Sequence, residues 1–192
     1  YMEKGGAEET VDAAREAVWE TGNNVLTYEG NLIEATYFSC SGGSTEDAVA
    51  VWGTDVPYLR ATDSPGEEQA THFTDTVTFT VKEFAAALAL DLKGPPESWL
   101  GPVTYTEGGG VRTMMIGGIS FEGTALRKIL NLRSTAFTME AGENGIVVTT
   151  RGYGHRVGMS QYGADAMAAA GKDYPQILSH YYQGTVLTSW TD

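Results

Sequence analysis

The chain has 192 residues, of which 42% are hydrophobic, and this is enough to bury a core in one domain or in one domain with a small insertion. Its formal net charge of -13 opposes contacts with phosphate groups, so we expect no nucleic-acid partner. The single cysteine, Cys40, excludes a disulfide bond within these residues and a zinc site built from several cysteines.

The first third of the chain predicts a helix followed by a β-hairpin. Residues 10–20 place apolar side chains three and four positions apart, begin with a capping threonine and end before Gly22, as helices do. Residues 25–28 and 32–39 have the pattern of two strands around a glycine-containing turn. The second strand leads into residues 39–45, a loop of small polar residues.

The middle of the chain predicts a second group of helices and strands. Residues 76–81 alternate as in a strand, and a capping box at Thr80 and Glu83 opens a helix. Residues 103–116 predict a hairpin that is interrupted by consecutive glycines, and residues 123–130 predict a short helix.

The last third predicts a strand, a glycine-rich loop and two helices. Residues 146–150 form the expected strand, and residues 151–164 surround His155 with glycines. An alanine-rich helix that ends at Gly171 follows, and Asp173 caps the final helix.

Together these elements indicate an α+β fold with a mainly antiparallel sheet and packed helices. We expect residues 1–73 and 139–192 to form the main domain. Residues 74–138 are expected to form a smaller inserted α/β subdomain.

His155 and the start of the following helix offer polar groups to a ligand. On its glycine-rich loop, His155 could relay protons or donate a hydrogen bond near neutral pH. Ser160, Gln161 and Tyr162 combine free helix amides, two polar side chains and an aromatic ring, all of which a sugar can use. The alternatives are a loop histidine bonded to a nearby carbonyl group, and a Ser160 that only caps the helix.

A hydrolase is a second hypothesis for the same residues. Cys40 or Ser41 could act as a nucleophile beside His155, although neither lies in a local signature sequence. A small cysteine at the end of a strand more often serves packing, and a loop of serines and glycines more often serves as a bend. The scattered histidines lack the spacing of metal ligands, so we expect no metal and no cofactor.

Two glycine-bearing segments and several landmarks between and after them resemble the SpoIID/LytB family. The first segment is residues 37–45, with Trp52 and residues 57–59 after it, and the second is residues 152–164. Further landmarks stand in the same order at residues 126–137 and 177–184. The resemblance spans nearly the whole chain.

The resemblance implies a role in the bacterial cell wall. SpoIID-type members are lytic transglycosylases that cut between N-acetylmuramic acid and N-acetylglucosamine during endospore formation and leave a 1,6-anhydro product. LytB-type members are described as amidase enhancers, which implies a non-catalytic wall-binding module as the alternative. The implied partners are peptidoglycan glycan strands and a cell-wall amidase, and the implied location is outside the cytoplasm.

The resemblance also implies which residues line a glycan-binding cleft. His155 is expected to support the chemistry without being its acid. The residues expected to line the cleft are Ser41, Gly42, Gly43, Thr45, Ser160, Gln161 and Tyr162.

The family's catalytic glutamate lies in an N-terminal motif, and we expect it upstream of Tyr1, so the sequence leaves open whether this chain is itself an enzyme. The first residues resemble neither a signal peptide nor a translation start, which also leads us to expect preceding residues. Glu46 is the carboxylate close to a motif loop, and as a loop glutamate we expect it to be solvated. Arg156 replaces a glycine that is common in the family's histidine motif.

Overall fold

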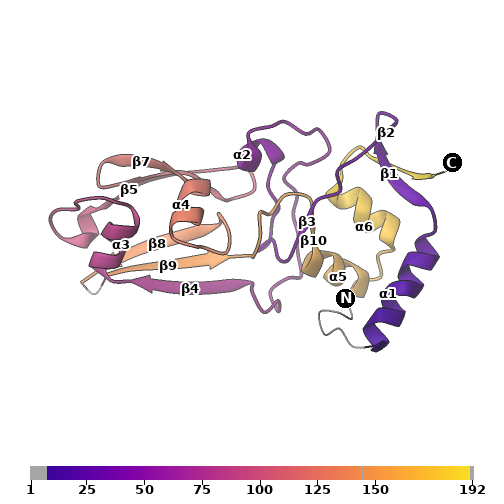
Figure 1. The fold of residues 1–192 in the computed structure, drawn as a ribbon, viewed down its shortest axis with the longest axis horizontal. Coiled ribbons are helices and arrows are strands. Elements are labelled where there is room, and N and C mark those ends of the chain that lie inside the picture. Colours follow the sequence, from indigo (N-terminus) through magenta and orange to yellow (C-terminus); the bar gives the residue numbers. More distant parts are fainter. Residues whose placement is uncertain (1–7, 144, 191–192) are drawn as a thin grey trace. The chain divides into compact units, whose positions relative to one another are not determined.

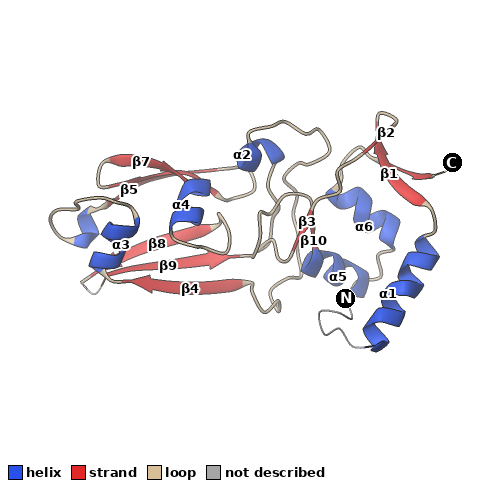
Figure 2. Ribbon diagram, in the orientation of Figure 1, coloured by secondary structure: helices blue, strands red, loops and turns tan. Residues whose placement is uncertain are grey.

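The computed structural model describes residues 8–143 and 145–190, which fall into two compact units. Unit 1 comprises the described residues up to 34 and from 185 onward, and unit 2 comprises residues 35–184. The predicted α+β class is confirmed, because helices and small sheets, mostly antiparallel, make up both units (Figure 1 and Figure 2).

Unit 1 consists of one helix and a three-stranded antiparallel sheet. α1 (Glu8–Thr21) covers the predicted helix but begins before Thr10, so the prediction that Thr10 caps it is wrong. β1 (Asn24–Tyr28) pairs with β2 (Asn31–Leu32) across the predicted turn. β1 also pairs along its other edge with β11 (Val186–Ser189). Segments from the two ends of the described chain therefore share one sheet.

The predicted strand at residues 32–39 is wrong in its length. Pairing with β1 stops at Leu32, and residues 33–36 belong to no strand. β3 (Tyr37–Phe38) then pairs in parallel with β10 (Met159–Ser160). The alternating pattern predicted extended backbone, but the segment changes its partner between Leu32 and Tyr37, and an alternating pattern alone does not specify the partner strand.

Most of unit 2 packs around one apolar core between two three-stranded antiparallel sheets. One sheet pairs its strands in the order β4 (Thr74–Phe79), β9 (Gly145–Arg151) and β8 (Phe137–Gly142). The other pairs them in the order β5 (Leu100–Tyr105), β6 (Val111–Ile116) and β7 (Ile119–Glu122). The helical segments beside them are α3 (Val81–Ala87), α4 (Gly123–Ile129) and a 3-10 helix, η2 (Pro96–Ser98).

In Figure 2, α3 and α4 lie between these two sheets. The predicted capping box is present at the start of α3, where Thr80 Oγ1 accepts from Glu83 N and the Glu83 carboxylate accepts from Thr80 N. Side chains from both sheets and both helices meet in the core, among them Phe84, Leu126 and Ile146, which are fully buried. The core therefore joins the middle of the chain to strands of its last third.

The rest of unit 2 carries α2 (Ala48–Trp52), α5 (Gln161–Ala169) and α6 (Tyr174–Tyr181). Ser160 caps α5 by accepting from Gly163 N, and Asp173 opens α6 with a capping box. Both caps agree with the sequence pattern. In the part of the chain that the structure describes, no helix has the length and apolar character needed to cross a membrane.

Strand pairing also connects the predicted main domain with the predicted insertion. β4, at residues 74–79, pairs along its whole length with β9 of the last third. The division into 1–73 with 139–192 and an inserted 74–138 stays a prediction.

Candidate functional site

The loop after β3 and the loop before β10 lie side by side, because β3 and β10 are parallel neighbours. Cys40 and Tyr153 exchange two backbone hydrogen bonds, with N···O distances of 3.1 and 2.7 Å. Glu46 N donates to the Arg156 carbonyl oxygen at 2.6 Å. The two segments that the sequence singled out, residues 39–45 and 151–164, are thus parts of one structure.

A buried carboxylate, Glu67, holds the first loop in shape. Its Oε2 atom accepts hydrogen bonds from the amides of Ser41 and Gly42 at 2.8 and 3.0 Å, and from the Ser41 hydroxyl at 2.8 Å. Its Oε1 atom accepts from the Ser64 hydroxyl at 2.7 Å, and Ser64 also bonds to the Tyr181 hydroxyl. Only 1% of Glu67 is exposed, so these donors replace its hydration.

The same hydrogen bonds keep Glu67 ionised. Burial raises the pKa of this carboxyl, but hydrogen bonds from Ser160, Ser64, Ser41 and Cys40 outweigh burial and leave the pKa below its ordinary value. Ser41 belongs to the first loop and Ser160 to the second, so both loops donate to one anion. A general acid needs a raised pKa, and Glu67 therefore has the character of a structural anion.

The start of α5 reaches this carboxylate because Gly163 has no side chain. A Cβ atom at Gly163 would collide with Ser64 Oγ and the Tyr181 hydroxyl. A larger residue would push the helix away from Glu67 and break the contact between the loops.

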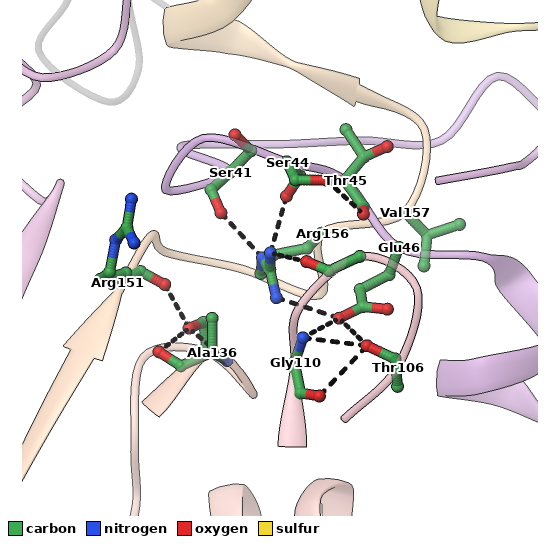
Figure 3. A network of polar contacts seen from close by, with 12 residues as sticks. Ser41, Ser44, Thr45, Glu46, Thr106, Gly110, Ala136, Arg151, Arg156 and Val157 are labelled. Atoms are coloured by element: carbon green, nitrogen blue, oxygen red, sulfur yellow. Dashed lines mark hydrogen bonds and ion pairs between the residues drawn. The ribbon is translucent and has the colours of Figure 1, made fainter. Parts of the chain in front are cut away.

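A second buried carboxylate, Glu46, pairs with Arg156. Its Oε1 atom accepts from Arg156 Nη1 at 3.0 Å, from Thr106 Oγ1 at 2.8 Å and from Gly110 N at 2.9 Å (Figure 3). Glu46 is 1% exposed, so the prediction of a solvated loop glutamate is wrong. The cause is the turn between β5 and β6, which supplies Thr106 and Gly110 as donors and covers the carboxylate.

The Arg156 side chain bonds to three loops, although its backbone has a conformation that is unfavourable for an arginine. Besides Glu46, it donates from Nε to the Ser41 carbonyl and from Nη2 to the carbonyls of Ser44 and Gly108, each at 2.7 Å. Its φ of 66° lies in the left-handed region, which favours glycine. The positive φ explains why a glycine suits this position. The arginine adds four hydrogen bonds that connect the loops.

His155 packs between aromatic rings. Its ring centroid lies 5.5 Å from that of Phe38, edge to face, and 5.3 Å from that of Trp52. Phe38 is buried below it, whereas Trp52 is 44% exposed. His155 therefore lies between the buried ring of Phe38 and the exposed indole of Trp52, and supports the indole.

The surroundings of His155 favour its neutral form. Burial lowers the pKa of the imidazole, a hydrogen bond to the Tyr37 backbone raises it, and the charge of Arg127 lowers it further, leaving the pKa below its ordinary value. Nδ1 lies 3.1 Å from Val157 N and accepts its hydrogen bond. Since the ring bonds to the backbone on both sides of the site, the alternative of a loop histidine bonded to a carbonyl has direct support.

Trp52 packs on His155, and two more exposed aromatic residues are linked to it through the backbone: Tyr37, whose backbone bonds to the His155 ring, and Tyr153, two residues before it. We call these four residues the aromatic face. Tyr37 is 61% exposed, Trp52 44% and Tyr153 42%. The Arg133 guanidinium lies 5.2 Å from the Tyr153 ring centroid, which fixes that ring on one side. Trp52 and Tyr153 are therefore exposed rings that are each packed against a second side chain.

Two pockets of unit 2 lie beside Trp52 or the first motif loop. The larger, of about 550 Å³, lies beside Trp52 and is also lined by residues 49–53, by Arg112 and by Glu122. The smaller, of about 360 Å³, is lined by residues 42–44, the turn at 108–109, and the side chains of Arg151 and Arg156. The larger pocket adjoins the aromatic face through Trp52.

Comparison with known proteins identifies relatives along most of the chain. Stage II sporulation protein D of Bacillus subtilis (strain 168) is 42% identical over 174 residues, covering 90% of this chain and 50% of that protein. The protein of the same name from Bacillus amyloliquefaciens is 43% identical over 169 residues, covering 88% of this chain and 48% of that protein. An amidase enhancer of Bacillus subtilis (strain 168) is 31% identical, covering 91% of this chain and 32% of that protein.

The chain belongs to the SpoIID/LytB-like family. It spans about half the length of the two sporulation proteins. No family model matches it. The similarity to these three relatives along about 90% of the chain confirms the resemblance that the motif residues predicted.

Within this SpoIID/LytB-like chain, three of the expected cleft side chains are buried. Ser41, Thr45 and Ser160 have no exposed surface. Ser41 bonds to Glu67, and the Thr45 hydroxyl bonds to the backbone of Thr62, outside the motif loop. These three side chains shape the loops from inside.

The other expected cleft residues reach the surface or a pocket. Gly42 and Gly43 line the smaller pocket. Gln161 and Tyr162 are exposed on the first turn of α5. Their contact with a glycan stays a prediction.

Sequence reasoning missed Glu67. It stands between Gly66 and Glu68 in a segment without helical or strand periodicity, so no pattern marks it. The other two histidines make local contacts: His72 bonds to Arg133 Nη1 and His180 to the Asp63 carbonyl. In residues 8–143 and 145–190 no group of His, Cys, Asp or Glu is placed to hold a metal ion.

The surroundings of Cys40 oppose a thiol nucleophile. Burial raises the pKa of this thiol to about 12, and the thiol lies 3.2 Å from Glu67 Oε2 as a hydrogen-bond donor. We therefore expect iodoacetamide at pH 8 to leave Cys40 unmodified in the folded protein and to modify it fully in urea, as measured by intact mass. Rapid modification of the folded protein would contradict the raised pKa of Cys40 and would support the thiol-hydrolase hypothesis.

Proposed function

We propose that this chain binds the glycan strands of peptidoglycan at the aromatic face and the adjoining pocket, and that it acts outside the cytoplasm in the cell-wall remodelling of sporulation. The observation that carries the proposal is the exposed ring of Trp52 packed on His155, together with the exposed Tyr37 and Tyr153 on the two neighbouring motif segments. Exposed aromatic rings stack on the apolar faces of sugars, and net charge matters little to a neutral sugar. The names of the relatives, two sporulation proteins and an amidase enhancer, support the cellular setting.

In this proposal His155 positions the indole of Trp52 and keeps it in contact with the larger pocket. Its neutral ring bonds to the backbone near Tyr37 and Val157, which suits a positioning residue better than a proton relay. Gln161 and Tyr162 would extend the contact along the strand from the first turn of α5.

Replacing Trp52 with alanine is expected to weaken binding to peptide-free glycan strands about tenfold, because the stacking surface is lost. Co-sedimentation with insoluble strands and isothermal titration with soluble fragments both measure this. Trp19→Ala is the matched control, since Trp19 lies on α1 with 89% of its surface exposed. Equal affinities for the two variants would remove the aromatic face from the proposal.

For the whole protein we propose lytic cleavage between N-acetylmuramic acid and N-acetylglucosamine. One carboxyl group would protonate the glycosidic oxygen as its bond to C1 breaks, and its carboxylate would then take the proton of the muramoyl 6-hydroxyl as O6 bonds to C1. This acid requires a raised pKa. Glu67 is held ionised and Glu46 is paired with Arg156, so we propose that the acid lies outside this chain.

The second candidate function is a non-catalytic module that binds the wall and stimulates an amidase. The amidase enhancer among the relatives favours it, as does the structural use of both buried carboxylates. The Glu122 carboxylate lines the larger pocket, so Glu122→Gln tests for an acid within the chain.

Mass spectrometry of peptide-free strands after incubation with the whole protein separates the two functions. Lytic cleavage predicts 1,6-anhydromuramoyl ends, made equally by the wild type and by Glu122→Gln. If no anhydro ends appear and a cell-wall amidase instead works faster in the presence of the protein, the stimulating module replaces the enzyme.

A further inference from the structure

The smaller pocket of unit 2 is basic, although the protein as a whole carries a net charge of -13. Arg151 and Arg156 both line it, and none of its described lining residues is acidic. The remaining lining residues include glycines of the first motif loop and the hydroxyl-bearing side chains of Tyr105, Thr138 and Thr149. Two guanidinium groups in one pocket repel each other, so each charge requires an anionic partner nearby.

The charge of Arg156 already has a partner. Four of its five N–H groups donate, one of them to Glu46 and three to carbonyl oxygens. Burial lowers the pKa of Arg156, Glu46 raises it, and the charge of Arg151 lowers it further, which places the two guanidinium groups within electrostatic range. Arg156 and Glu46 therefore neutralise each other beneath the pocket.

The charge of Arg151 has no such partner. Arg151 is exposed and forms no ion pair with any residue that the structure describes. Its guanidinium lies 5.5 Å from the Phe73 ring centroid, and Nη2 lies beside Gly43, where a Cβ atom would come within 3.5 Å. The main chain is fixed, because Arg151 N donates to the Ala136 carbonyl and the Arg151 carbonyl accepts from Ser134 (Figure 3).

We propose that this pocket binds a carboxylate group of peptidoglycan through Arg151, an inference that deepens the proposed glycan binding and rests on it. A guanidinium group holds a carboxylate with two parallel hydrogen bonds, and the absence of a side chain at Gly43 leaves room for the approach. The hydroxyls of Thr149 and Tyr105 offer further donors. The Arg156–Glu46 pair below keeps the loops around the pocket in place.

Two carboxylates of peptidoglycan have this chemistry. N-acetylglucosamine is neutral, whereas N-acetylmuramic acid carries a lactyl carboxylate that is ionised only when the stem peptide has been removed. The stem peptide itself carries other carboxylates. A contact with the lactyl group would make affinity depend on removal of the peptide, and a contact with the stem would have the opposite effect.

The experiment compares small probes with and without a carboxylate. N-acetylmuramic acid, its neutral methylamide and the dipeptide L-alanyl-D-glutamate are titrated into the wild-type chain, and the Arg151 Nε–H signal is followed by NMR. We expect a carboxylate probe to bind about tenfold more tightly than the methylamide, and this preference to shrink as salt is raised. Preference for the acid over its methylamide assigns the lactyl group, and tighter binding of the dipeptide assigns the stem.

Variants test whether Arg151 is responsible. By isothermal titration, which does not depend on the Arg151 signal, Arg151→Gln is expected to abolish the preference and Arg151→Lys to retain part of it, while the melting temperature shows that each variant is folded. Lys172→Gln removes an equal charge from the exposed loop after α5 and is expected to change nothing. If wild type and Arg151→Gln show the same preference, or if no carboxylate probe is preferred, the inference is overturned.

A neutral oligomer of N-acetylglucosamine separates this inference from the proposed function. If the oligomer binds in a Trp52-dependent way while no carboxylate is preferred, the pocket inference fails and glycan binding stands. If carboxylate probes move the Arg151 signal while no glycan binds, glycan binding fails and the pocket stands as an anion site.

Discussion

Replacing Glu67 with glutamine is expected to lower the free energy of unfolding by about 3–5 kcal/mol. The carboxylate accepts from two amides and two hydroxyls of Ser41, Gly42 and Ser64, and a glutamine would turn donors of its own toward these donors. Urea unfolding followed by circular dichroism measures the loss. The neighbouring Glu68→Gln is the matched control, because Glu68 is exposed and its loss is expected to stay within about 0.5 kcal/mol.

The same carboxylate predicts a pH dependence. Since the folded pKa of Glu67 lies below its ordinary value of 4.5, its contribution to stability is complete above that pH and is lost as the pH falls through the folded pKa. The wild type should therefore lose stability relative to Glu67→Gln on acidification. If both proteins have the same stability at pH 7, or the difference between them grows as the pH falls, Glu67 does not have this structural role.

Replacing Arg156 with methionine is expected to cost about 3–5 kcal/mol, because Glu46 would be left as a buried charge without its cation. Arg156→Gly should cost less than Arg156→Met, since glycine adopts the φ of 66° without strain. Adding Glu46→Gln to either variant should recover part of the loss. Chemical unfolding of the single and double variants measures these differences.

A surface ion pair provides the contrast for this prediction. Arg133 and Asp75 lie 2.8 Å apart, but their side chains are 33% and 41% exposed. Asp75→Asn is therefore expected to cost at most about 1 kcal/mol. A cost for Arg156→Met as small as that for Asp75→Asn would contradict the role given to the buried pair.

The parts of the fold that follow from local patterns could be predicted from the sequence. Thr80 with Glu83, Ser160 and Asp173 mark helix starts because a capping side chain bonds to amides within three residues. The hairpin of β5 and β6 follows from alternation and glycine in the same way. These signals need no knowledge of distant partners.

The parts that depend on distant partners could not be predicted. Glu46 and Glu67 look like ordinary loop glutamates, and their burial follows from donors up to 110 residues away, such as Arg156. The change of strand partner after Leu32 likewise depends on β10, more than 100 residues later. The motif loops were recognised correctly, but several of their polar side chains point inward to these anions.

NMR of the tryptophan indole N–H signals during titration with peptide-free glycan strands tests the central claim most directly. The chain has four tryptophans, of which Trp52 lies on the aromatic face, Trp99 is buried and bonded to the Lys93 carbonyl, and Trp19 and Trp190 belong to unit 1. Glycan binding at the aromatic face predicts a saturable shift of the Trp52 signal while the other three stay in place. A saturated titration in which Trp52 does not move, or in which only Trp19 or Trp190 moves, would contradict the account.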